Sequence, residues 1–186
     1  MTAALDVIEL PLAGLKLIKP KVFGDARGFF LESYHEPRYR AAGIDTGFVQ
    51  DNHSRSKKGT LRGLHYQERP GQAKLVRVCS GRIYDVSVDI RPESPTFGQW
   101  CGEYLDADSH QQLFIPIGFA HGFCVVSEFA EVLYKVSNPY DPSTEKTIAW
   151  NDPDIGVVWP EQSPLLSERD QTGEPFADFT RRTKKA

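Results

Sequence analysis

Short apolar segments, broken at close intervals by Gly, Pro, Asn and Asp, constrain this chain more than any other feature of its sequence. Segments of this length, rich in β-branched and aromatic residues and bounded by turn formers, are typical of strands. Many short strands with few helices predict an all-β sandwich or barrel. The candidate strands are 14–23, 28–34, 47–54, 60–67, 74–81, 82–90, 98–105, 111–118, 120–127, 130–138 and 146–152.

Strict alternation is plainest in 82–90 and predicts a strand with two different faces. One face would carry Tyr84, Val86, Val88 and Ile90, and the other Ile83, Asp85, Ser87 and Asp89. Helical signals are confined to two short segments. One is 35–43, with Pro37 near the first turn and Gly43 at the stop, and the other is 164–170.

The 186 residues, 40% of them hydrophobic, suffice for one well-packed domain, and neither a repeat nor a linker divides them. We therefore expect a single domain over 1–186, with its core at about 16–170. The formal net charge of −3 gives no basic face for nucleic acid. The basic run of Arg181, Arg182, Lys184 and Lys185 is expected to be a flexible, solvated C-terminal tail.

No apolar stretch approaches the roughly 20 residues that a membrane helix needs, and the first residues lack the features of a signal peptide. Cys79, Cys101 and Cys124 are odd in number and without metal-like spacing, which indicates reduced thiols. The sequence therefore predicts a cytoplasmic protein with neither a membrane nor a nucleic-acid partner.

His65 stands in the segment Gly59–Gln67, GTLRGLHYQ, where strict alternation would put Arg62 and His65 on opposite faces. Gly63 between them is a natural place for a bulge that turns both side chains inward. A strand histidine taken alone is more often structural than catalytic, so its neighbours decide its role.

A second histidine, His121, follows Pro116 and Gly118 in the pattern P-x-G-x-x-H. Here the sequence resembles the cupin superfamily of small β-barrels. The first cupin motif, G-x5-H-x-H, retains His65 but has Gln67 at its second histidine, and Lys74 lies near the position of its glutamate. Because a catalytic metal usually needs three His or carboxylate ligands, we expect no metal.

The segments 22–34, 48–67, 71–100, 115–123, 133–145 and 150–160 are similar to the dTDP-4-dehydrorhamnose 3,5-epimerase family. The resemblance runs from about residue 16 to 170. It implies a cupin-type double-sheet β-barrel, or jelly roll, with a few short helices. It also implies an isomerase of dTDP-L-rhamnose biosynthesis that inverts C3 and C5 of a nucleotide-linked 4-keto-6-deoxyglucose without a cofactor.

The same resemblance assigns roles to four residues. His65 would be the base and Asp170 the carboxylate that orients it, with Asp85 as a rival for that position. Tyr134 would return a proton from the opposite face. Lys74 would stabilise the negative charge that develops on O4, since both reacting carbons flank the C4 ketone.

The implied substrate contacts are more numerous. Arg27 and Arg62 would contact the diphosphate, and Tyr140 would stack on the base, with Pro139 in place of a second aromatic residue. Arg169 stands where relatives often have Lys. The remaining positions are Phe30, Glu32, Gln50, Asp51, Asn52, His121 and Glu145. Arg27, Phe30 and Glu32 belong to a strand that relatives exchange between subunits, which implies a homodimer.

Three other interpretations stay open. A single-centre epimerase of another keto-deoxysugar nucleotide would keep the same His, Lys and Tyr. A non-catalytic cupin would be expected to lack one of His65, Lys74, Tyr134 and Asp170, and all four are present. A metal-dependent cupin such as a dioxygenase is disfavoured by Gln67. Proton exchange in D2O and a metal analysis distinguish these alternatives.

Overall fold

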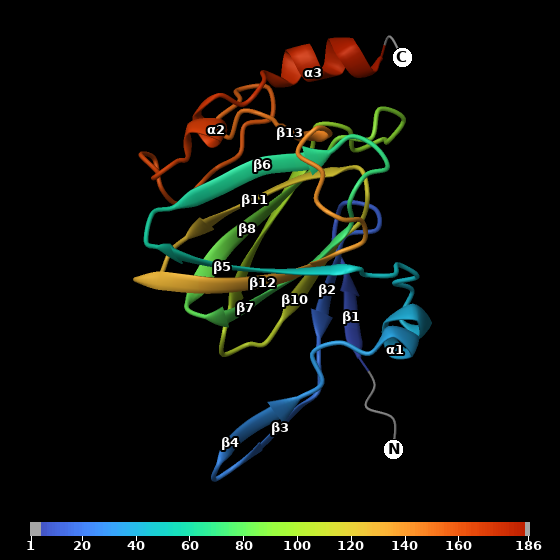
Figure 1. Ribbon diagram of the computed structural model, residues 1–186, viewed down its shortest axis with the longest axis vertical. Helices are drawn as coiled ribbons and strands as arrows, with labels where there is room; N and C mark the ends of the chain where they lie inside the picture. The colour runs from blue at the N-terminus through green and yellow to red at the C-terminus, as the bar shows by residue number, and fades with distance from the viewer. Residues whose placement is uncertain (1–4, 185–186) are drawn as a thin grey trace.

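Two antiparallel sheets face each other and form the body of the molecule (Figure 1). The computed structural model describes residues 5–184. Within them one sheet has the order β1-β2-β10-β7-β12-β5, and the other has the order β13-β6-β11-β8-β9. The strands are β1 (Asp6–Glu9), β2 (Lys16–Lys19), β3 (Val22–Asp25), β4 (Gly28–Leu31), β5 (Gln50–Lys57), β6 (Leu61–Gln67), β7 (Lys74–Ser80), β8 (Arg82–Asp89), β9 (Trp100–Asp106), β10 (Gln112–Ile115), β11 (Phe119–Val125), β12 (Phe129–Val136) and β13 (Glu145–Thr147).

The main apolar core lies between the sheets, because alternate side chains of both sheets point into the same space. Val76 and Val132 come from one sheet, and Ile83 and Phe123 from the other. Alternation in β8 is confirmed: Val86 and the residues in phase with it pack on the opposite side, in a different cluster. Toward one end of the barrel the inward side chains are polar, and the candidate site lies there.

The outer face of each sheet has its own cover. α1 (Glu36–Ala41) has Pro37 in its first turn, as expected. Its Tyr39 packs with Leu75 and Phe114 of the six-stranded sheet that contains β7 and β10. The expected helix at 164–170 is shorter and later, as α2 (Glu168–Gln171). Each expected strand is present in part, with 14–23 divided by Pro20 and β1 not foreseen.

The C-terminal segment, expected to be a solvated tail, forms a helix as far as Thr183, although the side chain of Arg181 is largely exposed. α3 (Phe176–Thr183) buries Phe176 and Phe179 against the outer face of the β13–β9 sheet. Arg182 donates to Tyr66 and Glu174 and pairs with Glu68. The basic run does not predict this helix, because the helix is anchored by Phe176 and Phe179 and not by the basic residues. Lys185 lies outside the described residues.

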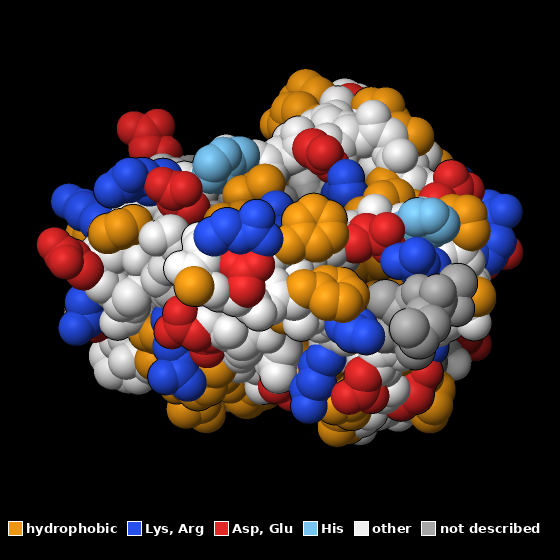
Figure 2. Space-filling model, turned by 90° about the horizontal axis from the view of Figure 1, so that it is seen from below, with side chains coloured by type: hydrophobic (Ala, Val, Ile, Leu, Met, Phe, Trp, Pro, Cys, Tyr) orange, Lys and Arg blue, Asp and Glu red, His pale blue; other side chains and the backbone are white. Residues whose placement is uncertain are grey.

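The β3–β4 hairpin projects away from the barrel and contacts it little (Figure 1). Phe23, Phe29 and Phe30 are 50%, 63% and 69% exposed on it. Figure 2, viewed from the end at which the hairpin projects, shows hydrophobic side chains exposed among charged ones. An isolated two-stranded hairpin with exposed aromatic side chains is only marginally stable in water.

No helix among residues 5–184 is long and apolar enough to cross a membrane. Cys79, Cys101 and Cys124 are free thiols.

Candidate active site

A β-bulge in β6 turns two functional side chains into the same cavity. His65 pairs with His121 of β11 and Arg62 with Phe123, so Gly63 and Leu64 together face one residue of the partner strand. Gly63 has a φ of +136°, and a Cβ there would lie 2.4 Å from the Cα of Gly122. Only glycine meets both conditions. The bulge expected at Gly63 is confirmed, and it points Arg62 and His65 inward together.

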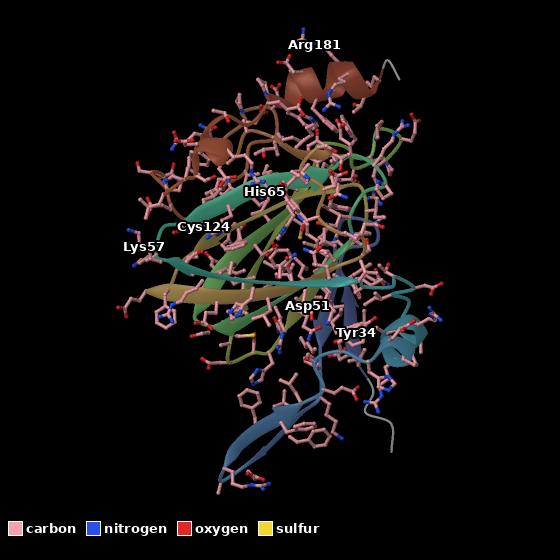
Figure 3. The ribbon with its side chains drawn as sticks, in the orientation of Figure 1. Tyr34, Asp51, Lys57, His65, Cys124 and Arg181 are labelled. Atoms are coloured by element: carbon pink, nitrogen blue, oxygen red, sulfur yellow. The ribbon has the colours of Figure 1, made fainter. Side chains whose placement is uncertain are left out.

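The cavity has a volume of about 320 Å³ and takes its walls from both sheets. In Figure 3 His65 lies on the β6 side, while Asp51 marks β5 of the facing sheet. The lining residues are Gln50, Asn52, Ser54, Arg62, His65, Gln72, Lys74, His121, Phe123, Tyr134, Tyr140, Glu145 and Arg169. Ten of the residues that the sequence singled out are among them.

His65 is held by a buried carboxylate. Its Nε2 donates to Asp170 Oδ1 at 2.5 Å, and Asp170 also accepts from Ser167 Oγ at 2.7 Å. Burial, Arg169 and Lys74 lower the pKa of His65 below its ordinary value, against the opposite effect of Asp170. Burial alone would raise the pKa of Asp170. The hydrogen bonds from His65 and Ser167 outweigh burial and lower this pKa. An ionised Asp170 thus fixes the ring, and Nδ1 of neutral His65 is the unprotonated nitrogen that can act as a base.

The rival carboxylate has a different partner. Asp85 of β8 accepts from His121 Nε2 at 3.0 and 2.9 Å, and it is fully buried. Asp85 therefore orients His121, and Asp170 orients His65. The end of the barrel contains two separate imidazole–carboxylate pairs, whose histidines lie on the neighbouring strands β6 and β11.

Lys74 and Tyr134 enter the cavity from the facing sheet, on β7 and β12. Burial lowers the pKa of Lys74 to about 8, while Glu145 and Asp85 act in the opposite direction. Burial, with a smaller contribution from Glu145, raises the pKa of Tyr134. Tyr134 is accordingly a protonated hydroxyl at neutral pH, and Lys74 is a cation with a proton held less tightly than usual.

Arg169, Glu145 and Tyr140 stand at the mouth of the cavity. Arg169 pairs with Glu145, and the negative charge of Glu145 raises the pKa of Tyr140. Tyr140 is 50% exposed and presents a free aromatic surface. Its loop is fixed by Gln67, which accepts from the Asp141 amide, and by Gln50, which accepts from the Tyr140 amide.

The residues at the cupin metal positions fit a metal poorly. Gln67 uses its amide on the loop that carries Tyr140, and Lys74 adds a positive charge beside the two histidines. Among residues 5–184 no group of three or more His, Cys, Asp or Glu side chains has a ligating arrangement.

Four predicted contact residues lie away from the cavity of this chain. Arg27 stands at the exposed turn between β3 and β4 and pairs with Asp25. Phe30 lies on the same hairpin, and Glu32, just after it, pairs with Arg38. Asp51 points to the outer face of β5 and binds Lys135. A single chain does not bring these four to His65.

Sequence reasoning missed three lining residues and one support. Ser54 continues the inward phase of Gln50 and Asn52 along β5, so alternation could have found it. Ser167 caps α2 and binds Asp170, a spacing of three that resembles a capping box. Gln72 and Phe123 gave no signal that separates them from loop and core residues.

A β-barrel whose cavity is lined by a carboxylate-bound histidine, a buried lysine and a facing tyrosine has the groups that an enzyme of proton transfer needs. The chain belongs to the dTDP-4-dehydrorhamnose 3,5-epimerase family, whose model matches residues 9–178. A relative of that name from Pseudomonas aeruginosa is 54% identical over 172 residues, which is 91% of this chain and 95% of the relative.

Solved structures of epimerases are also similar to this chain. The 3,5-epimerase from Legionella pneumophila, in complex with dTDP-4-keto-L-rhamnose, has a TM-score of 0.91 at 45% identity, covering 94% of this chain and 96% of that one. A 3′-monoepimerase from Streptomyces bikiniensis, in complex with dTDP-quinovose, has a TM-score of 0.88 at 35% identity, covering 94% and 89%. The chain is an isomerase with a cupin-type fold, and both expectations are confirmed.

Proposed function

We propose that this enzyme inverts C3 and C5 of dTDP-4-dehydro-6-deoxy-D-glucose, giving dTDP-4-dehydro-L-rhamnose for dTDP-L-rhamnose biosynthesis. One observation supports this most directly: His65 enters the cavity from one sheet, and Tyr134 enters it from the other. Inversion of a carbon requires removal of a proton on one face and its return on the opposite face. A base and an acid on facing walls meet that requirement.

In the proposed mechanism, Nδ1 of His65 takes the proton from C3, and the electron pair of the C–H bond moves into an enolate with its charge on O4. The Lys74 ammonium stabilises that charge. The Tyr134 hydroxyl then gives its proton to C3 from the opposite face, and the enolate collapses to the ketone. Solvent returns a proton to Tyr134 and takes one from His65. The same steps at C5 complete the reaction, without metal or redox cofactor.

Asp170 acts in this mechanism as a positioning carboxylate. Its bond to Nε2 sets the tautomer in which Nδ1 is unprotonated, and its charge stabilises the imidazolium that forms. Burial keeps His65 neutral before the reaction, so the base is ready at neutral pH.

The nucleotide would extend toward the mouth of the cavity. Arg62 and Arg169 supply guanidinium groups for the diphosphate, and Tyr140 supplies a face for the base. Further polar contacts would come from Gln50, Asn52, His121 and Glu145.

We propose further that the enzyme is a cytoplasmic homodimer of single-domain subunits, in which the β3–β4 segment of each protomer completes the site of the other. The exposed aromatic side chains of that hairpin support this arrangement. Exchange would bring the Arg27, Phe30 and Glu32 positions of one subunit near the mouth of its partner's cavity.

The reaction is tested by proton NMR of the 4-keto-6-deoxyglucose nucleotide with enzyme in D2O. Loss of the signals of both C3–H and C5–H is expected. Exchange at one carbon alone would support a single-centre epimerase. The similarity to the Streptomyces bikiniensis monoepimerase supports this second candidate. Exchange at neither carbon would overturn both.

Strand exchange is tested by mixing two inactive or impaired proteins, His65→Asn and Arg27→Ala, after reversible dissociation. In a swapped heterodimer one site receives an intact His65 and an intact Arg27, so activity should rise above that of either protein alone. Unchanged activity in a verified heterodimer would place Arg27 outside the partner's site.

A further inference from the structure

One contact at the mouth of the cavity has no part in the mechanism above: the guanidinium of Arg169 lies against the base. Its Nη2 is 2.9 Å from Nε2 and 3.2 Å from Nδ1 of His65. Nε2 already donates to Asp170, so a nitrogen this close to both ring nitrogens lies over the face of the imidazole. Guanidinium groups stack on aromatic faces in this way.

Arg169 has a fixed backbone and a side chain with room to move. Its neighbour Asp170 is buried with 4% side-chain exposure, and the bond to His65 holds it in place. The Arg169 side chain itself is 47% exposed, and Glu145 of β13 holds its other terminal nitrogen. Two contacts, with Glu145 and with the ring of His65, therefore determine where the guanidinium rests.

The position of this guanidinium conflicts with proton abstraction. A carbon acid has to approach the base to roughly 3–3.5 Å, and Arg169 nitrogen already occupies that shell around Nδ1. A cation at this distance also opposes the positive charge that His65 gains when it accepts a proton. For the reaction to proceed, the guanidinium has to leave.

We propose that Arg169 is a latch, which covers His65 in the free enzyme and is drawn away by the diphosphate of the bound substrate. The proposal rests on the function given above and deepens it. A diphosphate accepts a guanidinium bidentately and carries more negative charge than Glu145, so it competes for Arg169. Binding at the nucleotide end thereby uncovers the base at the sugar end, and the site selects for diphosphate-linked keto sugars.

Several charged and titratable groups face His65, and the test has to separate Arg169 from them. They are Asp170 on α2, Lys74 on β7, His121 on β11, Tyr134 on β12, Glu145 on β13 and Arg62 on its own strand. Burial and Arg169 both lower the pKa of His65, with burial the larger cause. Removal of Arg169 leaves the remaining groups in place.

The direct test is a carbon-13 NMR titration of His65 in the full-length enzyme, with the resonance assigned by its loss in His65→Asn. In Arg169→Met the pKa of His65 should rise by about one pH unit relative to wild type, because a contacting cation is lost. Adding dTDP should raise this pKa more in wild type than in Arg169→Met. Arg181→Met, at the far end of α3, removes a comparable charge and should change nothing (Figure 3).

Equal His65 pKa values in free wild type and Arg169→Met would overturn the latch, and so would equal shifts on adding dTDP. These readouts need no turnover, so the latch fails or holds independently of the epimerase reaction. A second measurement compares two substrates, for which the proposal predicts opposite effects of the same variant. Arg169→Met should raise the KM for the nucleotide-linked sugar yet increase deuterium exchange into free 4-keto-6-deoxyglucose several-fold. Equal or slower exchange into the free sugar would contradict the proposal.

Discussion

Two imidazole–carboxylate pairs lie side by side in the barrel, yet their surroundings differ. His65 and His121 are directly opposite each other in the β6–β11 ladder. The His65–Asp170 pair joins a strand to a helix far away in the sequence, and Ser167 gives it a further hydrogen bond. The His121–Asp85 pair joins two adjacent strands, and its side chains are 8% and 0% exposed.

The difference teaches that a histidine motif does not assign chemistry by itself. Both histidines occupy positions of the cupin pattern, and both have a carboxylate partner. His65 also faces Lys74 and Tyr134 across the cavity, and the half-exposed Arg169 contacts its ring. We therefore expect His65 to accept protons and His121 to bind substrate.

The largest expected effect comes from replacing each of the two histidines, one at a time, by asparagine. His65→Asn removes the base, so kcat for deuterium exchange should fall by about 10⁴-fold. His121→Asn keeps a polar side chain and should act mainly on KM, by roughly tenfold. Steady-state kinetics with the nucleotide sugar measures both.

The outcome that would break the comparison is a similar loss of kcat in the two variants, which would make His121 a second proton carrier. Circular dichroism and thermal unfolding serve as controls for correct folding, because asparagine fills only part of the space of the buried imidazole ring.

The partner carboxylates should differ in the same direction, with smaller effects. Asp170→Asn removes the charge that stabilises the imidazolium and leaves the tautomer of His65 unfixed, so kcat should fall by about 10³-fold. Asp85→Asn should lower kcat/KM by roughly tenfold through KM. Activity of Asp170→Asn close to that of Asp85→Asn would show that orientation of His65 does not depend on this carboxylate.

Tyr134→Phe should produce a smaller and more selective loss. Without the hydroxyl, water alone can return a proton to the opposite face, so net inversion should fall by about 10²-fold. His65 still removes a proton and returns a deuteron on its own face, so exchange should persist. The ratio of exchange to inversion, followed by NMR in D2O, should therefore rise while the KM stays near its wild-type value. A parallel loss of both would assign Tyr134 to an earlier step.

Much of the fold could be predicted, because the alternation of apolar and polar residues marks the strands and the turn residues mark their ends. The two faces of β8 and the bulge at Gly63 follow from local sequence, and the structure has both. α3 does not follow from local sequence, because its basic residues are typical of a tail and Phe176 and Phe179 anchor it by contacts with residues far away in the chain.

The site was predictable where a motif or the family resemblance marked it and not where tertiary contacts made it. His65 and His121 stand in motifs, but the choice between Asp85 and Asp170 depends on which carboxylate the fold brings to which ring. The contact of Arg169 with His65 also depends on three-dimensional placement, since α2 and β6 are distant in sequence. Alternation could have revealed Ser54, while Gln72 had no distinguishing pattern.

The most gradual expected effect is a pH dependence that separates the base from the cation opposite it. Neutral His65 is the active form and its pKa lies below the ordinary value of 6.5, so kcat/KM should fall only in acid, below about that pH. Charged Lys74 is the active form and its pKa is about 8, so kcat/KM should decline about tenfold per pH unit above 8.

Lys74→Arg keeps a charge that does not titrate in this range, so the alkaline decline should disappear while the acid decline stays. Lys74→Met, a variant closer in volume, should lose about 10²-fold in kcat and likewise show no decline above pH 8. A decline that remains in both variants would place its origin outside Lys74. If the alkaline decline is lost and the acid decline is unchanged, the alkaline decline belongs to Lys74 on one sheet and the acid decline to His65 on the other.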